Sequence, residues 1–214
     1  IAIPDNVSCI GQSAFQYCSS LNNATIGGSV SSIGTSAFSG CSQLPRIAIP
    51  NSVTNIGQSA FHQCYSLTNV TIGSGVTAIG VFVFEFCFNL TNIDVVAENL
   101  FLSSANGVLF NKDQTKLLRC PYGMAGNYEA PNSVIIIDNY AFQWCTNLTN
   151  ITLPNSVTTV DDYAFQYCTS MTNIITSSNL TSIGHFAFNN CPQLTGISIP
   201  NGTFFIDDSA FSGC

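Results

Sequence analysis

The chain has 214 residues, of which 46% are hydrophobic, 7% are charged and only four are basic, so that its net charge is −7. This length allows one packed domain, while the shortage of Lys and Arg argues against nucleic acid as a partner, because phosphate neutralisation supplies most of that affinity. No apolar run approaches the roughly 20 residues of a membrane span, and a surface of Asn, Thr, Ser and Gln favours proteins or sugars as partners.

A repeat of 23 residues runs through the chain. Cysteines recur at this interval in two series, and each has a phenylalanine three residues before it: Cys18, Cys41, Cys64, Cys87, Cys145, Cys168, Cys191 and Cys214. One copy of this length cannot bury its own apolar residues, whereas stacked copies can, so we expect a solenoid. The sequence predicts one domain over residues 1–214 with about nine repeats, and we expect it to be a fragment of a longer protein.

Each copy begins with an extended segment in which apolar and polar residues alternate. In one copy, Val70 and Ile72 are expected to point inward, and the polar residues beside them to point outward. A turn and a second extended segment follow, and in several copies this segment ends at a glycine. We expect the glycine to open a short helical turn that carries the alanine, phenylalanine and cysteine of the repeat.

One copy in the middle of the chain is expanded. Phe84 and Phe142 lie 58 residues apart, which is 12 more than two repeats, and the extra residues fall around 94–131. Asn106-Gly107 is a tight-turn dipeptide, and residues 108–118 have the pattern of strand, turn and strand. We expect a β-hairpin that protrudes from the solenoid and offers a contact site made of three of the four basic residues: Lys112, Lys116 and Arg119.

No catalytic, cofactor or metal site is predicted. The periodic cysteines lack the close pairs of a zinc site, so we expect a column of buried thiols, although neighbouring coils would be close enough for disulfides. Cys9 falls at an outward position and is expected to be exposed. Aspartates replace the glycine of the turn in three copies, where they are expected to accept hydrogen bonds from free N–H groups; a weak cation site between Asp138 and Asp161 is the less favoured alternative. His62 and His185 are expected to lie on the surface.

The outward columns of the first extended segment are the candidate ligand-binding face. Two columns contain mostly threonine and asparagine, and they predict these contact residues: Thr68, Asn69, Thr91, Asn92, Thr149, Asn150, Thr172 and Asn173. The alternative is structural, because Thr favours strands and stacked Asn side chains satisfy one another. Aromatic residues form further columns at the turn, where packing along the edge is favoured over an exposed contact stripe: Phe82, Tyr140, Tyr163, Phe186, Trp144 and Tyr167.

The copies "IPNSVTNIGQSAFHQCYSLTNVTIG" and "LPNSVTTVDDYAFQYCTSMTNI" resemble the BspA-like leucine-rich repeats, also called the Treponema pallidum type. The expanded copy "SSANGVLFNKDQTKLLRCPYG" resembles the hairpin variant found among such repeats. The resemblance implies an α/β repeat solenoid, with a right-handed superhelix, a parallel sheet typified by residues 148–153 and short helical turns opposite. It implies no catalytic residues. The chain departs from the family pattern at residues 171–180, where a local irregularity is expected.

The resemblance also implies a location and a class of function. Members of this family are typically secreted or cell-surface proteins, and several are implicated in adhesion to host proteins or to other cells. We therefore expect an extracellular or cell-surface module that binds extracellular or host proteins without catalysis. Two alternatives stay open: a structural spacer, and a carbohydrate-binding face formed by the Asn and Thr columns.

Overall fold

The computed structural model describes residues 1–214 and contains strands and turns but no helix. The chain forms two compact units, Ile1–Gly107 and Val108–Cys214, and each is described by itself. The first contains β1 (Ala2–Ile3), β2 (Cys9–Ile10), β3 (Thr25–Ile26), β4 (Ser32–Ile33), β5 (Arg46–Ile49), β6 (Asn55–Ile56), β7 (Asn69–Ile72), β8 (Ala78–Ile79), β9 (Asn92–Val95) and β10 (Leu102–Ala105). The second contains β11 (Val108–Asn111), β12 (Lys116–Arg119), β13 (Ala125–Glu129), β14 (Ile136–Ile137), β15 (Asn147–Thr152), β16 (Thr159–Val160), β17 (Asn173–Ile175), β18 (Ser182–Ile183) and β19 (Phe205–Ile206).

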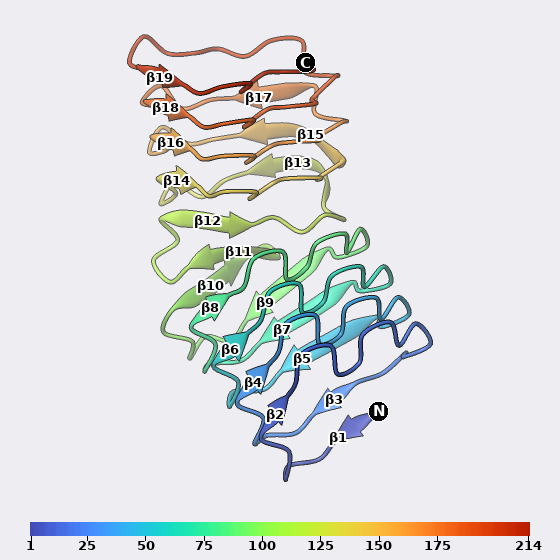
Figure 1. The fold of residues 1–214 in the computed structure, drawn as a ribbon. Helices are drawn as coiled ribbons and strands as arrows, with labels where there is room; N and C mark the ends of the chain where they lie inside the picture. The colour runs from blue at the N-terminus through green and yellow to red at the C-terminus, as the bar shows by residue number, and fades with distance from the viewer. The chain divides into compact units, whose positions relative to one another are not determined.

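In the first unit, successive coils add parallel strands to two layers (Figure 1). The first layer holds the sheets β1-β3 and β5-β7-β9, and the second layer holds the sheet β2-β4-β6-β8. Neighbouring strands pair exactly one repeat apart, so that Asn69 lies beside Asn92 and Val70 beside Ile93. Because the register equals the repeat length, each position of the repeat becomes a column of equivalent side chains.

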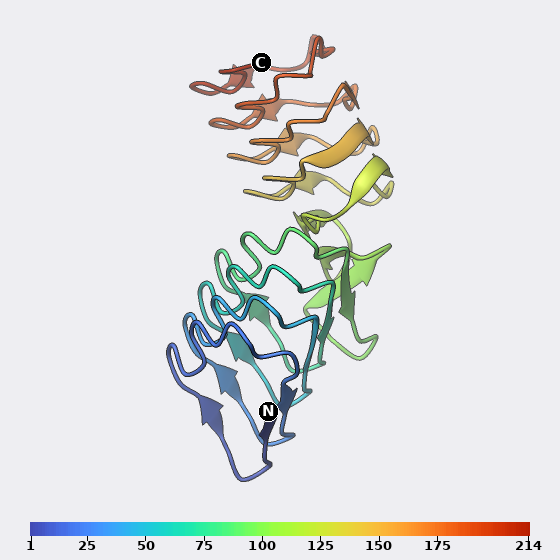
Figure 2. The ribbon, with the colours of Figure 1, turned by 90° about the vertical axis from the view of Figure 1, so that its right-hand side faces the viewer.

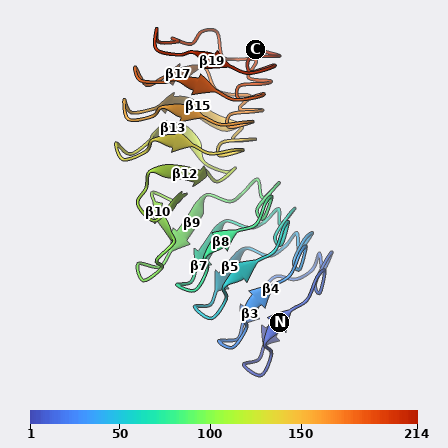
Figure 3. The ribbon, with the colours of Figure 1, turned by 60° about the vertical axis from the view of Figure 1, so that its left-hand side comes forward.

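The second unit is built in the same way. Its first layer is the sheet β13-β15-β17, whose strands lie one above another in Figure 3. Its second layer contains β11, β12, β14, β16, β18 and β19 in that order. Figure 2 shows the coils of each unit from the side, as separate stacked loops. The predicted solenoid of stacked parallel coils is therefore confirmed.

A column of phenylalanines lies at the centre of each unit. In the first unit the ring centroids of Phe38 and Phe61 are 5.3 Å apart and the rings are nearly parallel. In the second, Phe142 and Phe165 stack at 4.8 Å, and Phe165 and Phe188 at 5.0 Å. These five side chains are fully buried. Burial of one such side chain contributes roughly 1.5–3 kcal/mol, and ring stacking adds to it.

The expected helical turns are absent, so the α/β fold class is wrong and the fold is a β-solenoid. An α-helix requires each N–H to bond four residues back. Here the N–H groups of Ser13, Phe15 and Tyr17 bond to carbonyls of the next coil, at 2.7–2.9 Å. The intervening N–H groups of Ala14 and Gln16 bond only three residues back, at 3.3 and 3.1 Å. Three of these five donors thus stabilise the stack, and too few remain for a helix.

Two columns of this segment have left-handed backbone, although most of their residues are not glycine. The first column contains Ser13, Ser36, Ser59, Phe82, Tyr140, Tyr163, Phe186 and Ser209, and the second contains Tyr17, Gly40, Gln63, Phe86, Trp144, Tyr167, Asn190 and Gly213. Ser13 and Tyr17, with φ of 55° and 59°, each stand third in a hydrogen-bonded turn, the position at which a type II turn requires positive φ. This conformation costs a non-glycine residue roughly 1–2 kcal/mol, which the bonds between coils offset.

The predicted hairpin exists, but it does not protrude from the solenoid. Strands β11 and β12 pair antiparallel, with Phe110 opposite Leu117. Strand β12 also pairs in parallel with β14, where Leu117 lies beside Ile137, and Phe110, Leu117 and Val108 are fully buried. A free two-stranded hairpin is only marginally stable in water. The apolar residues of this hairpin therefore favour its incorporation into the sheet of the second unit.

The predicted irregularity near residue 175 shortens the sheet. Strand β17 has three residues, whereas β15, with which it pairs, has six. Ile175 ends β17 with more than half of its surface exposed, and residues 195–199 of the next coil form no strand.

Candidate functional site

The predicted contact residues fall into two groups, one on each unit. Thr68, Asn69, Thr91 and Asn92 belong to neighbouring coils of the first unit, where Asn69 pairs with Asn92. Thr149, Asn150, Thr172 and Asn173 belong to neighbouring coils of the second, where Asn150 pairs with Asn173. All eight are exposed or half-buried. Each group therefore forms a continuous polar face on its own unit.

The threonines of this face use their hydroxyl protons within the solenoid. Thr68 Oγ1 donates to the carbonyl of Pro45 in the preceding coil at 3.0 Å, and Thr91 Oγ1 donates to that of Thr68 at 3.3 Å. In the second unit, Thr172 Oγ1 donates in the same way to the carbonyl of Thr149 at 3.2 Å. The threonine column thus stabilises the stacking of coils, and it leaves methyl groups and hydroxyl lone pairs for a ligand.

The asparagine columns differ between the two units. In the first, the amide nitrogens of Asn69 and Asn92 both donate to Asp94 Oδ2, at 3.3 and 2.5 Å. In the second, Asn150 Nδ2 donates to Asn127 Oδ1 at 2.7 Å, so amides bond to one another along the stack. Asn127 extends the predicted column by one coil; it lies on β13 beside Asn150 of β15, a position that the expanded repeat hid in the sequence. These amides are held in place by their neighbours and keep their remaining hydrogen-bonding groups at the surface.

Lys116 and Arg119 of the hairpin are held by intramolecular contacts. Lys116 Nζ lies 2.7 Å from Asp138 Oδ1, and both side chains are partly exposed. The Arg119 guanidinium donates to the carbonyl of Tyr140 and lies 5.8 Å over the ring of Tyr122. Lys112 is exposed in the turn between β11 and β12. The three residues thus form no uniform basic patch, because Lys116 and Arg119 stabilise the second unit.

The turn aspartates bond chiefly to neighbouring groups of the second unit. Asp162 Oδ1 accepts the N–H of His185 in the next coil at 2.8 Å. Burial raises the pKa of Asp161, while the charge of Lys116 acts in the opposite direction. The structure contains no group of three or more His, Cys, Asp or Glu side chains able to hold a metal ion.

The periodic cysteines are free thiols, and the predicted burial is confirmed for all of them except Cys18 and Cys214, which are exposed. Most of the periodic thiols donate to the carbonyl of the phenylalanine 26 residues earlier; Cys64 reaches Phe38 at 3.3 Å and Cys168 reaches Phe142 at 3.1 Å. Cys145 instead donates to the carbonyls of Cys120 and Pro121 at 3.8 Å. Burial raises the pKa of Cys41 to about 12 and that of Cys168 well above its ordinary value. The thiolate is the reactive form, so these buried thiols are poor nucleophiles. Cys9 is exposed, as predicted.

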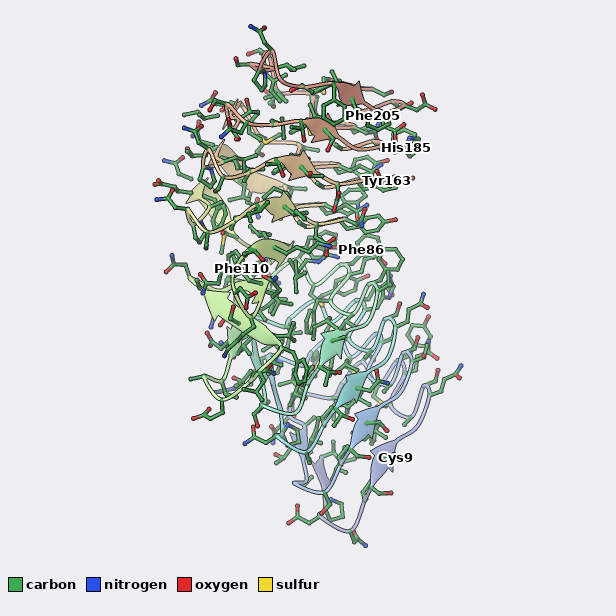
Figure 4. All side chains as sticks on the ribbon, turned by 90° about the vertical axis from the view of Figure 1, so that its left-hand side faces the viewer. Cys9, Phe86, Phe110, Tyr163, His185 and Phe205 are labelled. Carbon is green, nitrogen blue, oxygen red and sulfur yellow. The ribbon has the colours of Figure 1, made fainter.

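The turn aromatics of the second unit stack on one another. Tyr140 and Tyr163 lie 5.0 Å apart, Tyr163 and Phe186 lie 5.5 Å apart, and Trp144 stacks on Tyr167 at 4.0 Å. All five rings are half-buried. Figure 4 shows Tyr163 and the neighbouring His185 along one edge of this unit. The stacking agrees with the favoured interpretation that these rings pack along the edge of the solenoid.

Both histidines are half-buried and lie at the turns. His62 Nε2 lies 3.6 Å from Glu85 Oε2 in the next coil, and its ring packs edge-on against Phe86. His185 packs edge-on against Tyr163 and Phe186. Neither histidine lies beside a serine or cysteine nucleophile in these contacts. Among the elements of the structure there is no helix long and apolar enough to cross a membrane.

Comparisons with known proteins agree with this architecture. The BspA type leucine rich repeat region matches in six copies over residues 1–106 and 125–214. A leucine rich cell surface protein from Faecalibacterium prausnitzii is 30% identical with a TM-score of 0.65, over 100% of this chain and 70% of that one. The T. pallidum leucine rich repeat protein is 25% identical with a TM-score of 0.51, over 91% of this chain and 77% of that one.

The pneumococcal vaccine antigen PcpA has the same fold, with a TM-score of 0.77 at 23% identity over 96% of this chain. This chain spans only 57% of that protein's length. No curated protein sequence matches significantly. The repeat match, the register of one repeat between coils and the columns of buried phenylalanine and cysteine lead to one conclusion: the chain belongs to the BspA-type leucine-rich repeat family.

Proposed function

We propose that the chain is a secreted or cell-surface module that binds extracellular or host proteins through the outward faces of its first-layer strands, without catalysis. The observation that carries this proposal is the regular display of asparagine amides on β7, β9, β15 and β17 and of threonine side chains on β15 or directly before the other three strands. These side chains are fixed by neighbouring coils, so that binding would cost little conformational entropy. The cell-surface description of the relative from Faecalibacterium prausnitzii supports the location.

The composition favours a protein partner for this face. A polar surface with only 7% charged residues in the chain provides many neutral hydrogen-bonding groups and little long-range attraction. Recognition would then depend on shape and on hydrogen bonds over several coils, which suits a broad protein surface. The buried thiols and the stacked edge rings contribute rigidity to the faces.

The proposal is tested by screening the chain against an array of extracellular proteins, followed by surface plasmon resonance on each binder. The double variant Asn69→Ala/Asn92→Ala alters the face of the first unit, and Asn150→Ala/Asn173→Ala alters that of the second. Asn55→Ala is the matched control, because Asn55 is exposed on β6 in the other layer of the first unit. We expect at least one double variant to weaken binding about ten-fold or more, as for contacts at the centre of an interface, and the control to bind as the unaltered chain does.

Two results would contradict the proposal. If no extracellular protein binds while a glycan array gives a signal that depends on the same asparagines, the face binds carbohydrate. If neither array gives a signal, and an unrelated solenoid of equal length replaces the chain without loss of cell adhesion, the chain is a spacer.

A further inference from the structure

The first-layer sheet of the first unit is interrupted between β3 and β5. The sheets β1-β3 and β5-β7-β9 are separate, although their strands belong to consecutive coils. In later coils, the residue directly before the first-layer strand bonds to its equivalent in the preceding coil. The N–H of Thr68 bonds to the carbonyl of Pro45, and that of Thr91 bonds to the carbonyl of Thr68. Pro45 occupies the same position one coil earlier and has no N–H to donate. The first donor that could pair these two coils is therefore missing.

A surface pocket of about 270 Å³ lies at this break. Its polar lining residues are Asn23, Thr25, Arg46, Asn69 and Thr71, and Ala48 also belongs to its lining. Ala48 pairs in register with Thr71, which in turn pairs with Asp94. A methyl group thus stands where neighbouring coils carry larger polar side chains, and the missing atoms contribute to the hollow.

Arg46 is the only Lys or Arg in residues 1–107. Its side chain is exposed and makes neither an intramolecular hydrogen bond nor an ion pair, in contrast to Lys116 and Arg119. The amide of Asn23 and the hydroxyls of Thr25 and Thr71 also make no hydrogen bond to other groups, unlike the hydroxyl of Thr68. The pocket therefore gathers one cation and three neutral hydrogen-bonding groups that the fold does not use.

We propose that the Arg46 pocket is the subsite that receives an acidic side chain of a protein partner. The planar guanidinium matches a carboxylate through two parallel hydrogen bonds, and the neighbouring amide and hydroxyls are neutral donors for the remaining lone pairs. The volume is below the roughly 300–1,000 Å³ of pockets for drug-sized ligands, so it suits one side chain. The inference rests on the proposed protein-binding function and assigns a chemistry to one part of the face.

The test is an NMR titration of the full chain with two blocked peptides, acetyl-Gly-Glu-Gly-amide and acetyl-Gly-Gln-Gly-amide. They differ only in the charge of one side chain. We expect the Glu peptide to shift the Nε–Hε signal of Arg46 and the amides of β3 and β5, and to bind about ten-fold more tightly than the Gln peptide, as for a charge-assisted hydrogen bond.

Three variants test separately the charge of Arg46, the planar geometry of its guanidinium and the volume of the pocket. Arg46→Gln should abolish the preference for the Glu peptide, and Arg46→Lys should retain only part of it because the two-pronged geometry is lost. Ala48→Thr fills the hollow with the residue found at position 71, so it should weaken binding several-fold while Arg46 stays in place. Lys112→Gln is the control that removes an exposed cation elsewhere, and it should change nothing.

Equal affinity for the two peptides, or an Arg46→Gln variant that still prefers the Glu peptide, would overturn the inference. Preference for glucuronic acid over the Glu peptide would also overturn it, since the pocket would then be a sugar site. Failure of the proposed function gives a different result: the Glu peptide binds at Arg46, but no extracellular protein binds the chain. If proteins bind and Arg46→Gln has no effect, only the subsite is wrong.

Discussion

The turns of the two units have the same backbone conformation but carry different side chains. In the first left-handed column, Ser36 and Ser59 have φ of 54° in the first unit, and Tyr140 and Tyr163 have φ of 60° and 57° in the second. The same hydrogen bonds hold both: Ser59 N–H bonds to the carbonyl of Val81 at 3.0 Å, and Tyr163 N–H bonds to that of His185 at 2.8 Å. The conformation is therefore imposed by stacking of coils, and the side chain is free to be small or aromatic.

The largest expected effect on stability concerns the stacked phenylalanine core that both units contain. Phe61→Ala and Phe165→Ala each remove a ring from the centre of a stack, where both neighbours lie within 6 Å. We expect each variant to lower the free energy of unfolding by about 3–5 kcal/mol, measured by urea denaturation. If one variant lost less than about 1 kcal/mol, the two cores would not be equivalent.

A large effect of pH is also expected in both units. Burial raises the pKa of Cys41 to about 12 and that of Cys168 above its ordinary value of 9.0. The folded state therefore binds protons more tightly than the unfolded state, so that stability is complete below about pH 9 and falls as the pH rises through the folded pKa. Denaturation midpoints between pH 8 and 12 measure this loss, and Cys168→Ala should reduce it.

A further prediction separates the two kinds of turn. Ser59→Gly relieves the cost of a left-handed non-glycine residue but adds chain entropy, so we expect a gain of about 0.5 kcal/mol. Tyr163→Gly relieves the same cost but removes stacking on Tyr140 and Phe186, and should lose about 2 kcal/mol. Thermal unfolding compares the two variants. Stabilisation by both would show that the aromatic stack does not contribute.

The smallest expected effect concerns the hairpin of the second unit. Lys116 and Asp138 form a partly exposed ion pair, and such pairs contribute about 0–1 kcal/mol. Lys116→Met should therefore lower the free energy of unfolding by less than about 1 kcal/mol. The pKa of Asp161 should rise further, because the charge that lowers it is lost. NMR titration of the carboxyl groups measures this shift, and an unchanged pKa would contradict the assigned cause.

Much of the architecture could be predicted because the repeat length is directly visible. The spacing of Cys64 and Cys87 predicted the thiol column, and the spacing of Phe61 and Phe84 predicted the ring column. The turn was predicted wrongly, since Tyr163 and Trp144 do not suggest left-handed backbone in isolation. Two features of the pocket were visible in the sequence: Pro45 stands one repeat before Thr68 in a column of polar residues, and Ala48 stands between Thr25 and Thr71 in its column. Their combined effect depends on two neighbouring strands, and so it was missed.

The sequence by itself determined the coil length, the identity of the buried columns and the polar character of the outward faces. These follow from the period alone, because a register equal to the repeat stacks every residue on its equivalent. Tertiary structure decided how donors are used: whether an N–H bonds within its turn or to the next coil, and whether Arg119 faces solvent or the carbonyl of Tyr140. Those choices depend on the atoms that the next coil presents, and the atoms of that coil are brought close only by folding.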